Sequence, residues 1–106
     1  MMSRRPPIRI KSAQDLGLLR RSCRLAAETL LMVGENLRVG MTTLEIDQLV
    51  NRFTLDHGAV PATLGYHGYP KSVCTSINEV VCHGIPSRRR LKDGDIINVD
   101  VTCKLD

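Results

Sequence analysis

Two helix-start signals lie in the first half of the chain, at Ser12 and at Thr42. Each hydroxyl residue is followed three positions later by a carboxylate, Asp15 in the first case and Glu45 in the second. This spacing approximates a capping box, in which the hydroxyl accepts from the backbone N–H of the acidic residue and the carboxylate reaches back to the cap. We therefore predict a helix after each signal, the second over about residues 43–57.

Each predicted helix carries one apolar stripe and has a glycine near its end. Gly34 and Gly40 bracket the expected end of the first helix, and Gly58 should stop the second. The stripes, spaced by three and four residues, are Leu16, Leu19, Cys23, Ala26, Ala27 and Leu30 in the first helix and Ile46, Leu49, Val50 and Phe53 in the second. Helices with one apolar face must cover another layer of structure.

The second half of the chain is typical of strands and turns. Residues 59–70 are punctuated by glycine and proline and predict a bent loop. Residues 72–76 and 80–83 predict a hairpin, and residues 88–95 a charged turn. The clearest strand covers residues 96–104, because apolar and polar residues alternate there. Helices first and antiparallel strands second indicate an α+β fold.

Length and composition indicate one domain. The chain has 106 residues, of which 42% are hydrophobic and 25% charged. A basic segment with two prolines, residues 1–11, predicts an extended, mobile lead-in to a domain over residues 12–106. Four cysteines without a Cys-x-x-Cys pair, and a start without an apolar signal segment, predict reduced thiols in a cytoplasmic protein. We expect no membrane contact, since no apolar run approaches the ~18 residues of a transmembrane helix.

The net charge of +4 leaves two interpretations open. Arginine clusters at residues 20–24 and 88–90 could be solvated basic faces, or they could contact RNA or another acidic surface. Two tyrosines, one phenylalanine and no tryptophan are too few for a base-stacking platform.

Asp100 needs an explanation, because aspartate is depleted from strands. It either faces water on a strand with one wet face, or it holds a divalent cation from a rigid position. His83 ends an apolar run and precedes Gly84, which allows close approach of a ligand or of another backbone. His83 is either a structural residue or a hydrogen-bond donor to a polarised carbonyl.

Four further residues form a candidate pocket that mixes apolar bulk with hydroxyl, imidazole and thiol groups: Tyr66, His67, Tyr69 and Cys74. Such a mixture suits a linear, polarisable side chain, although aromatic rings that anchor a loop to the core are the alternative.

Three runs then become recognisable: GYHGYPKSVC at residues 65–74, SINEVVCHGIP at 76–86 and LKDGDIINVDV at 91–101. They closely resemble the type I methionine aminopeptidases. The resemblance implies the N-terminal half of the pita-bread fold and hydrolytic removal of N-terminal methionine from peptides and nascent chains. It also implies two divalent metal ions, of cobalt, manganese, iron or zinc, that activate a water molecule and polarise the substrate carbonyl.

The resemblance assigns roles residue by residue. His83 matches the histidine that contacts the substrate amide and stabilises the reacting carbonyl, and Asp100 matches the first of two metal-binding aspartates. Tyr66, Tyr69 and Cys74, with His67 beside them, match the pocket for the methionine side chain.

The chain also departs from the family pattern. Thr63 stands where many members have cysteine, and the family's other four metal ligands are expected beyond the last residue. We therefore expect the chain alone to hold no metal stably and to lack peptidase activity, and to associate either with a missing C-terminal half or with itself. Two alternatives are a non-catalytic pita-bread module that binds the ribosome, RNA or protein, and a proline-specific peptidase of the same fold.

Overall fold

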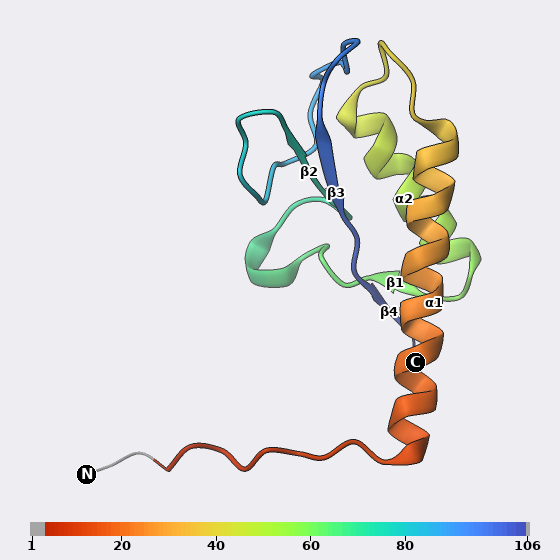
Figure 1. Ribbon diagram of the computed structural model, residues 1–106, viewed down its shortest axis with the longest axis vertical. Coiled ribbons are helices and arrows are strands. Elements are labelled where there is room, and N and C mark those ends of the chain that lie inside the picture. The colour runs from red at the N-terminus through yellow and green to blue at the C-terminus, as the bar shows by residue number, and fades with distance from the viewer. Residues whose placement is uncertain (1–3, 106) are drawn as a thin grey trace.

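The computed structural model describes residues 4–105, and two helices lie side by side along one face of its strands (Figure 1). Helix α1 spans Ala13–Asn36 and helix α2 spans Thr43–Asp56. The strands are β1 (Val60–Pro61), β2 (Cys74–Ile77), β3 (Ile97–Asp100) and β4 (Cys103–Lys104), with the short 3-10 helix η1 at Tyr66–Gly68. Residues 4–11 precede α1 without helix or strand.

Both predicted helix starts are confirmed. The Ser12 hydroxyl accepts from the Asp15 N–H at 3.1 Å, and the Asp15 carboxylate accepts from the Ser12 N–H at 3.0 Å, so the first capping box is complete. In α2 the Thr42 hydroxyl accepts from the Glu45 N–H at 3.2 Å. The first N–H groups of α2 donate to carbonyls of the loop at residues 87–89, which satisfies groups that a helix end leaves unpaired.

The predicted buried stripe of α1 is wrong in its orientation. The residues that α1 buries are Leu25, Thr29 and Val33, which lie about 100° around the helix from most of the predicted stripe. Leu16, Leu19 and Leu30 remain 42–46% exposed. The stripe of α2 is confirmed, since Ile46 and Val50 are almost fully buried.

The predicted hairpin is also wrong. Strand β2 pairs instead with β3, in the antiparallel register Cys74↔Asp100 to Ile77↔Ile97. Asn78 takes a left-handed conformation (φ 49°) in the turn after β2, and the chain from Val80 to His83 runs as a loop that is exposed from Val81 onward. Val81 is 93% exposed, so the apolar run that favoured a strand has no surface to cover.

The predicted strand over residues 96–104 is divided in two. Its first part, β3, pairs with β2, whereas its last two residues form β4 and pair with β1. Strand β1 lies within the predicted loop over residues 59–70. The predicted alternation is nevertheless confirmed, because odd-numbered residues from 97 to 103 are half-buried and even-numbered ones from 96 to 104 are exposed.

The core lies between the helices and the β2–β3 pair. It contains Val33, Met41, Ile46, Val50, Val73, Ile77 and Leu91, and Ile97 and Val99 pack against it. Burying a side chain of this kind contributes about 1.5–3 kcal/mol. Polar contacts add to this packing, because Asp47 of α2 accepts from the Ser72 N–H at 2.7 Å and thereby holds the start of β2.

Candidate active site

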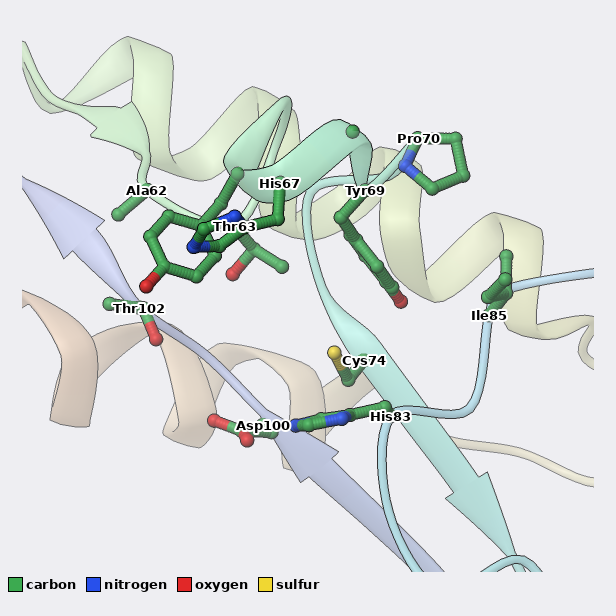
Figure 2. Close-up of a pocket in the computed structure, with 12 residues that line it drawn as sticks. Ala62, Thr63, His67, Tyr69, Pro70, Cys74, His83, Ile85, Asp100 and Thr102 are labelled. Atoms are coloured by element: carbon green, nitrogen blue, oxygen red, sulfur yellow. The ribbon is translucent and has the colours of Figure 1, made fainter.

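A cavity of about 790 Å³ lies on the face of the β2–β3 pair opposite the core (Figure 2). All six candidate site residues line it: Tyr66, His67, Tyr69, Cys74, His83 and Asp100. They come from four separate segments of the chain. The structure thus brings the predicted site together, and Thr63, the departure from the family pattern, also lines the cavity.

Asp100 and Cys74 reach the cavity because they are paired across β2 and β3. Directly opposed residues of an antiparallel pair point to the same face of the sheet. Asp100 is exposed and Cys74 is buried, and Figure 2 shows the carboxylate and the thiol on the same side of the strands. The sequence left open whether Asp100 faces water or belongs to a site. In the structure its carboxylate does both, because the exposed face of the strand is also the wall of the cavity.

His83 lies in a loop rather than at a strand end, and this corrects the predicted hairpin around it. Its φ angle is 55°, a left-handed conformation that costs a non-glycine residue about 1–2 kcal/mol. Its imidazole nevertheless points toward Asp100 across the cavity (Figure 2).

The pocket loop owes its shape to residues with positive φ. Gly65, His67 and Gly68 have φ angles of 80°, 47° and 78°, which confirms the predicted bend. The Tyr66 and His67 rings pack edge to face, with centroids 4.3 Å apart, and Tyr66 is 68% exposed. This part of the cavity wall is therefore open to solvent.

Tyr69 joins the pocket loop to β2. Its hydroxyl lies 2.9 Å from the Val73 carbonyl oxygen and 3.2 Å from the Gly84 carbonyl oxygen. Burial raises the pKa of Tyr69 above its ordinary value of 10.0, and the neighbouring Cys74 thiol adds to the shift. The phenol therefore stays protonated at neutral pH and remains a hydrogen-bond donor.

The prediction that Gly84 allows close approach is confirmed, and the approaching group is a backbone. A Cβ atom at Gly84 would overlap the carbonyl of Thr75 in β2. Ser76 has no role predicted from the sequence, yet its hydroxyl accepts from the Gly84 N–H at 3.1 Å. The only feature of the sequence that could have indicated this role is a small hydroxyl residue inside a buried strand.

The residues present do not form a metal site by themselves. Across residues 4–105, no group of three or more histidine, cysteine, aspartate or glutamate side chains is arranged to hold an ion. Useful sites require three or more protein ligands, so Asp100 could hold an ion only together with ligands from elsewhere.

One basic cluster is partly engaged in structural contacts. Arg90 donates to the Gly40 carbonyl at 2.7 Å, and Arg89 lies 3.5 Å from Glu79. These contacts favour a structural role for two of the three arginines at residues 88–90. In the same described range, no helix has the length and apolar character needed to cross a membrane.

Comparison with known proteins decides the family. The model of metallopeptidase family M24 matches residues 17–106, most of the chain. The chain belongs to metallopeptidase family M24. A curated relative, human mitochondrial methionine aminopeptidase 1D, is 55% identical over 95 residues, which are 90% of this chain and 28% of the relative.

Solved structures of other proteins agree with the fold. Methionine aminopeptidase from Rickettsia prowazekii matches with a TM-score of 0.90 and 46% identity, over 92% of this chain and 39% of that one. The predicted α+β class and partial pita-bread fold are thus confirmed. The prolidase from Pyrococcus horikoshii matches at 19% identity with a TM-score of 0.74, over 91% of this chain and 26% of that one, and shares the fold alone.

Proposed function

We propose that this chain supplies the substrate pocket, a carbonyl-binding histidine and one metal-binding carboxylate to a methionine aminopeptidase. The reaction is hydrolytic removal of methionine from the N-terminus of peptides and nascent chains. The observation that carries the proposal is the convergence of His83, Asp100 and the pocket loop on one cavity. The methionine aminopeptidases at 46–55% identity support it.

The pocket residues have separate roles in this proposal. Tyr66, His67, Tyr69 and Cys74 surround the methionine side chain, whose thioether makes favourable contacts with aromatic rings and thiols. His83 donates a hydrogen bond to the substrate carbonyl, and this bond strengthens as the carbon becomes tetrahedral. A proline-specific site is disfavoured, because the proline-directed relatives are far less similar in sequence.

Activity requires polypeptide beyond these 106 residues. The chain spans 28–39% of the length of the two methionine aminopeptidases reported above, and Asp100 has no sufficient set of co-ligands among the described residues. The exposed leucines of α1 offer apolar surface for such a partner segment. We therefore propose that the chain by itself is inactive and acts with a complementary half of the fold.

A chimera tests this function. Residues 12–106 are joined to the part of the Rickettsia enzyme that the structural match leaves uncovered, and the product is assayed on Met-Ala and Met-Gly peptides. We expect turnover from the chimera and none from the bare chain. His83→Ala should lower kcat by roughly 30- to 1000-fold with a smaller effect on KM, because its hydrogen bond acts mainly on the transition state.

His57→Ala is the matched control. His57 caps the end of α2, where its ring stacks on Phe53, so its loss should leave kcat near the parent value. Equal turnover of a folded, metal-loaded chimera with and without His83 would refute the role of that residue. Activity of the purified bare chain would refute the requirement for further ligands, whereas salt-dependent binding of ribosomal RNA with an inactive chimera would favour the binding module.

We propose that the chain works in the cytoplasm, where its four free thiols stay reduced. Some relatives are named for the mitochondrion or the chloroplast. Imaging of the tagged chain in its own cell tests the compartment, and an organellar signal would correct this part of the proposal.

A further inference from the structure

Gly84 forms the backbone contact that joins the His83 loop to β2. The Gly84 carbonyl accepts from the Thr75 N–H at 2.8 Å, on the edge of β2 that β3 leaves free. The two backbones are so close that a Cβ atom at Gly84 would overlap the Thr75 carbonyl. The residue that directly follows His83 is therefore held by a strand of the core.

Two side chains reinforce this contact from opposite ends. The Ser76 hydroxyl accepts from the Gly84 N–H at 3.1 Å, and the Tyr69 hydroxyl lies 3.2 Å from the Gly84 carbonyl oxygen. The same Tyr69 hydroxyl lies 2.9 Å from the carbonyl oxygen of Val73, the residue just before β2, so its single proton is shared between the Val73 and Gly84 carbonyls. Ser76 and Tyr69 thus engage both polar backbone groups of Gly84.

The chain on the other side of His83 offers little support. Val81, Cys82 and His83 are exposed, and His83 itself has the left-handed φ of 55°. A strained, exposed residue keeps its conformation only when neighbouring structure fixes it. Because residues before His83 are exposed, that structure is the anchored Gly84.

We propose that Tyr69 and Ser76 are positioning residues that fix Gly84 against β2 and thereby aim the His83 imidazole at the cavity beside Asp100. The catalytic meaning of this arrangement rests on the function proposed above. Tyr69 thus has a second task besides lining the cavity. Ser76 acts through Gly84 alone, since it is absent from the residues that line the cavity.

Nuclear magnetic resonance on the full 106-residue chain tests the proposal without any activity assay. The observables are the ring signals of His83 and the amide exchange rates of Gly84 and Thr75. We expect Ser76→Ala to accelerate Gly84 exchange roughly tenfold, because its N–H loses its acceptor. Tyr69→Phe keeps the ring and removes only the hydroxyl, and it should shift the His83 ring signals while those of His57 stay unchanged.

Matched variants separate positioning from a general loss of structure. Tyr66→Phe removes a hydroxyl from an exposed ring of the same loop, and Ser22→Ala removes one from α1; both should leave the His83 signals in place. Ser76→Thr retains an acceptor and should restore slow Gly84 exchange. Urea unfolding of each variant reports global stability.

The outcomes are decisive in both directions. Unchanged His83 signals and Gly84 exchange in both Tyr69→Phe and Ser76→Ala would overturn the proposal. Exchange that rises equally at all amides would also overturn it, because the effect would then be global. If the local changes occur but the chimera remains inactive, positioning stands and the proposed function fails.

Discussion

Asp100 lies directly opposite Cys74 across the antiparallel β2–β3 pair, and both line the cavity that His83 also lines. This register determines which strand residues reach the site. A slip of one residue would turn Asp100 toward the helices and bring Val99 or Val101 to the cavity. The contacts at the far end of the pair, where Asn78 and Asp95 meet, therefore matter for the site.

Asp95→Asn should reduce the acid sensitivity of the chain. The Asp95 carboxylate accepts from the Asn78 amide at 3.0 Å and from the Lys92 N–H at 2.8 Å, and these bonds hold its pKa below the ordinary value of 3.8. A lowered folded-state pKa contributes stability above pH 3.8, and this contribution is lost as the pH falls through the folded-state pKa. Urea unfolding midpoints at pH 6 and pH 3 measure how much stability each variant loses on acidification. Asp93→Asn, in the same turn, is the control. An unchanged pH dependence in Asp95→Asn would contradict the assignment.

Thr75→Val should stabilise the chain by about 1–2 kcal/mol. Thr75 shares a face of β2 with the core residue Ile77, and its buried hydroxyl has no hydrogen-bond partner among the described residues. Replacing it with the equally shaped valine removes this desolvation cost. The matched control is Thr29→Val in α1, which should destabilise because the Thr29 hydroxyl donates to the Leu25 carbonyl at 2.7 Å. Urea unfolding measures both, and a destabilised Thr75→Val would show that the hydroxyl is satisfied.

Gly84→Ala should destabilise the chain by about 1–3 kcal/mol, because the added methyl must displace the backbone of β2. Gly34→Ala provides the opposite case. Gly34 is an exposed helical glycine with open space around it, so Gly34→Ala should raise the free energy of unfolding by about 0.5–1 kcal/mol. Thermal unfolding measures the stability of both variants. If Gly84→Ala stabilises the chain as Gly34→Ala does, the backbone contact at Gly84 relaxes without cost.

Metal binding by the bare chain should be no tighter than about millimolar for Mn²⁺ or Co²⁺, because one carboxylate cannot replace the hydration shell of the ion. Titration calorimetry tests this expectation, with Asp100→Asn as the comparison. A micromolar site that disappears in Asp100→Asn would contradict it and would indicate ligands contributed by a second copy.

The bare chain should self-associate through the exposed face of α1. Leu16, Leu19 and Leu30 lie on one side of the helix and are each more than 40% exposed. Sedimentation velocity over a tenfold concentration range should show association, and Leu19→Lys with Leu30→Lys should weaken it. Leu55→Lys, on the exposed side of α2, is the control. A monomer at all concentrations would exclude this surface as an interface of the bare chain.

The sequence by itself determined the features that depend on neighbouring residues. The cap at Ser12 needs only a hydroxyl and a carboxylate three residues apart, and the structure contains both predicted bonds. The alternation from Ile97 to Cys103 likewise follows from the period of a strand. The resemblance assigns all the candidate site residues at once, because they lie in three runs that follow one another closely in the sequence.

Only the tertiary structure decided the pairing of β2 and the orientation of α1. A hairpin with residues 80–83 was locally plausible, but pairing with β3 buries Ile97 and Val99 against the core, whereas Val81 would have nothing to cover. On α1 two adjacent stripes are apolar, and contact with α2 and β4 selects the one that contains Leu25. These outcomes depend on competition between distant segments for the same apolar surface, and local spacing carries no information about that competition.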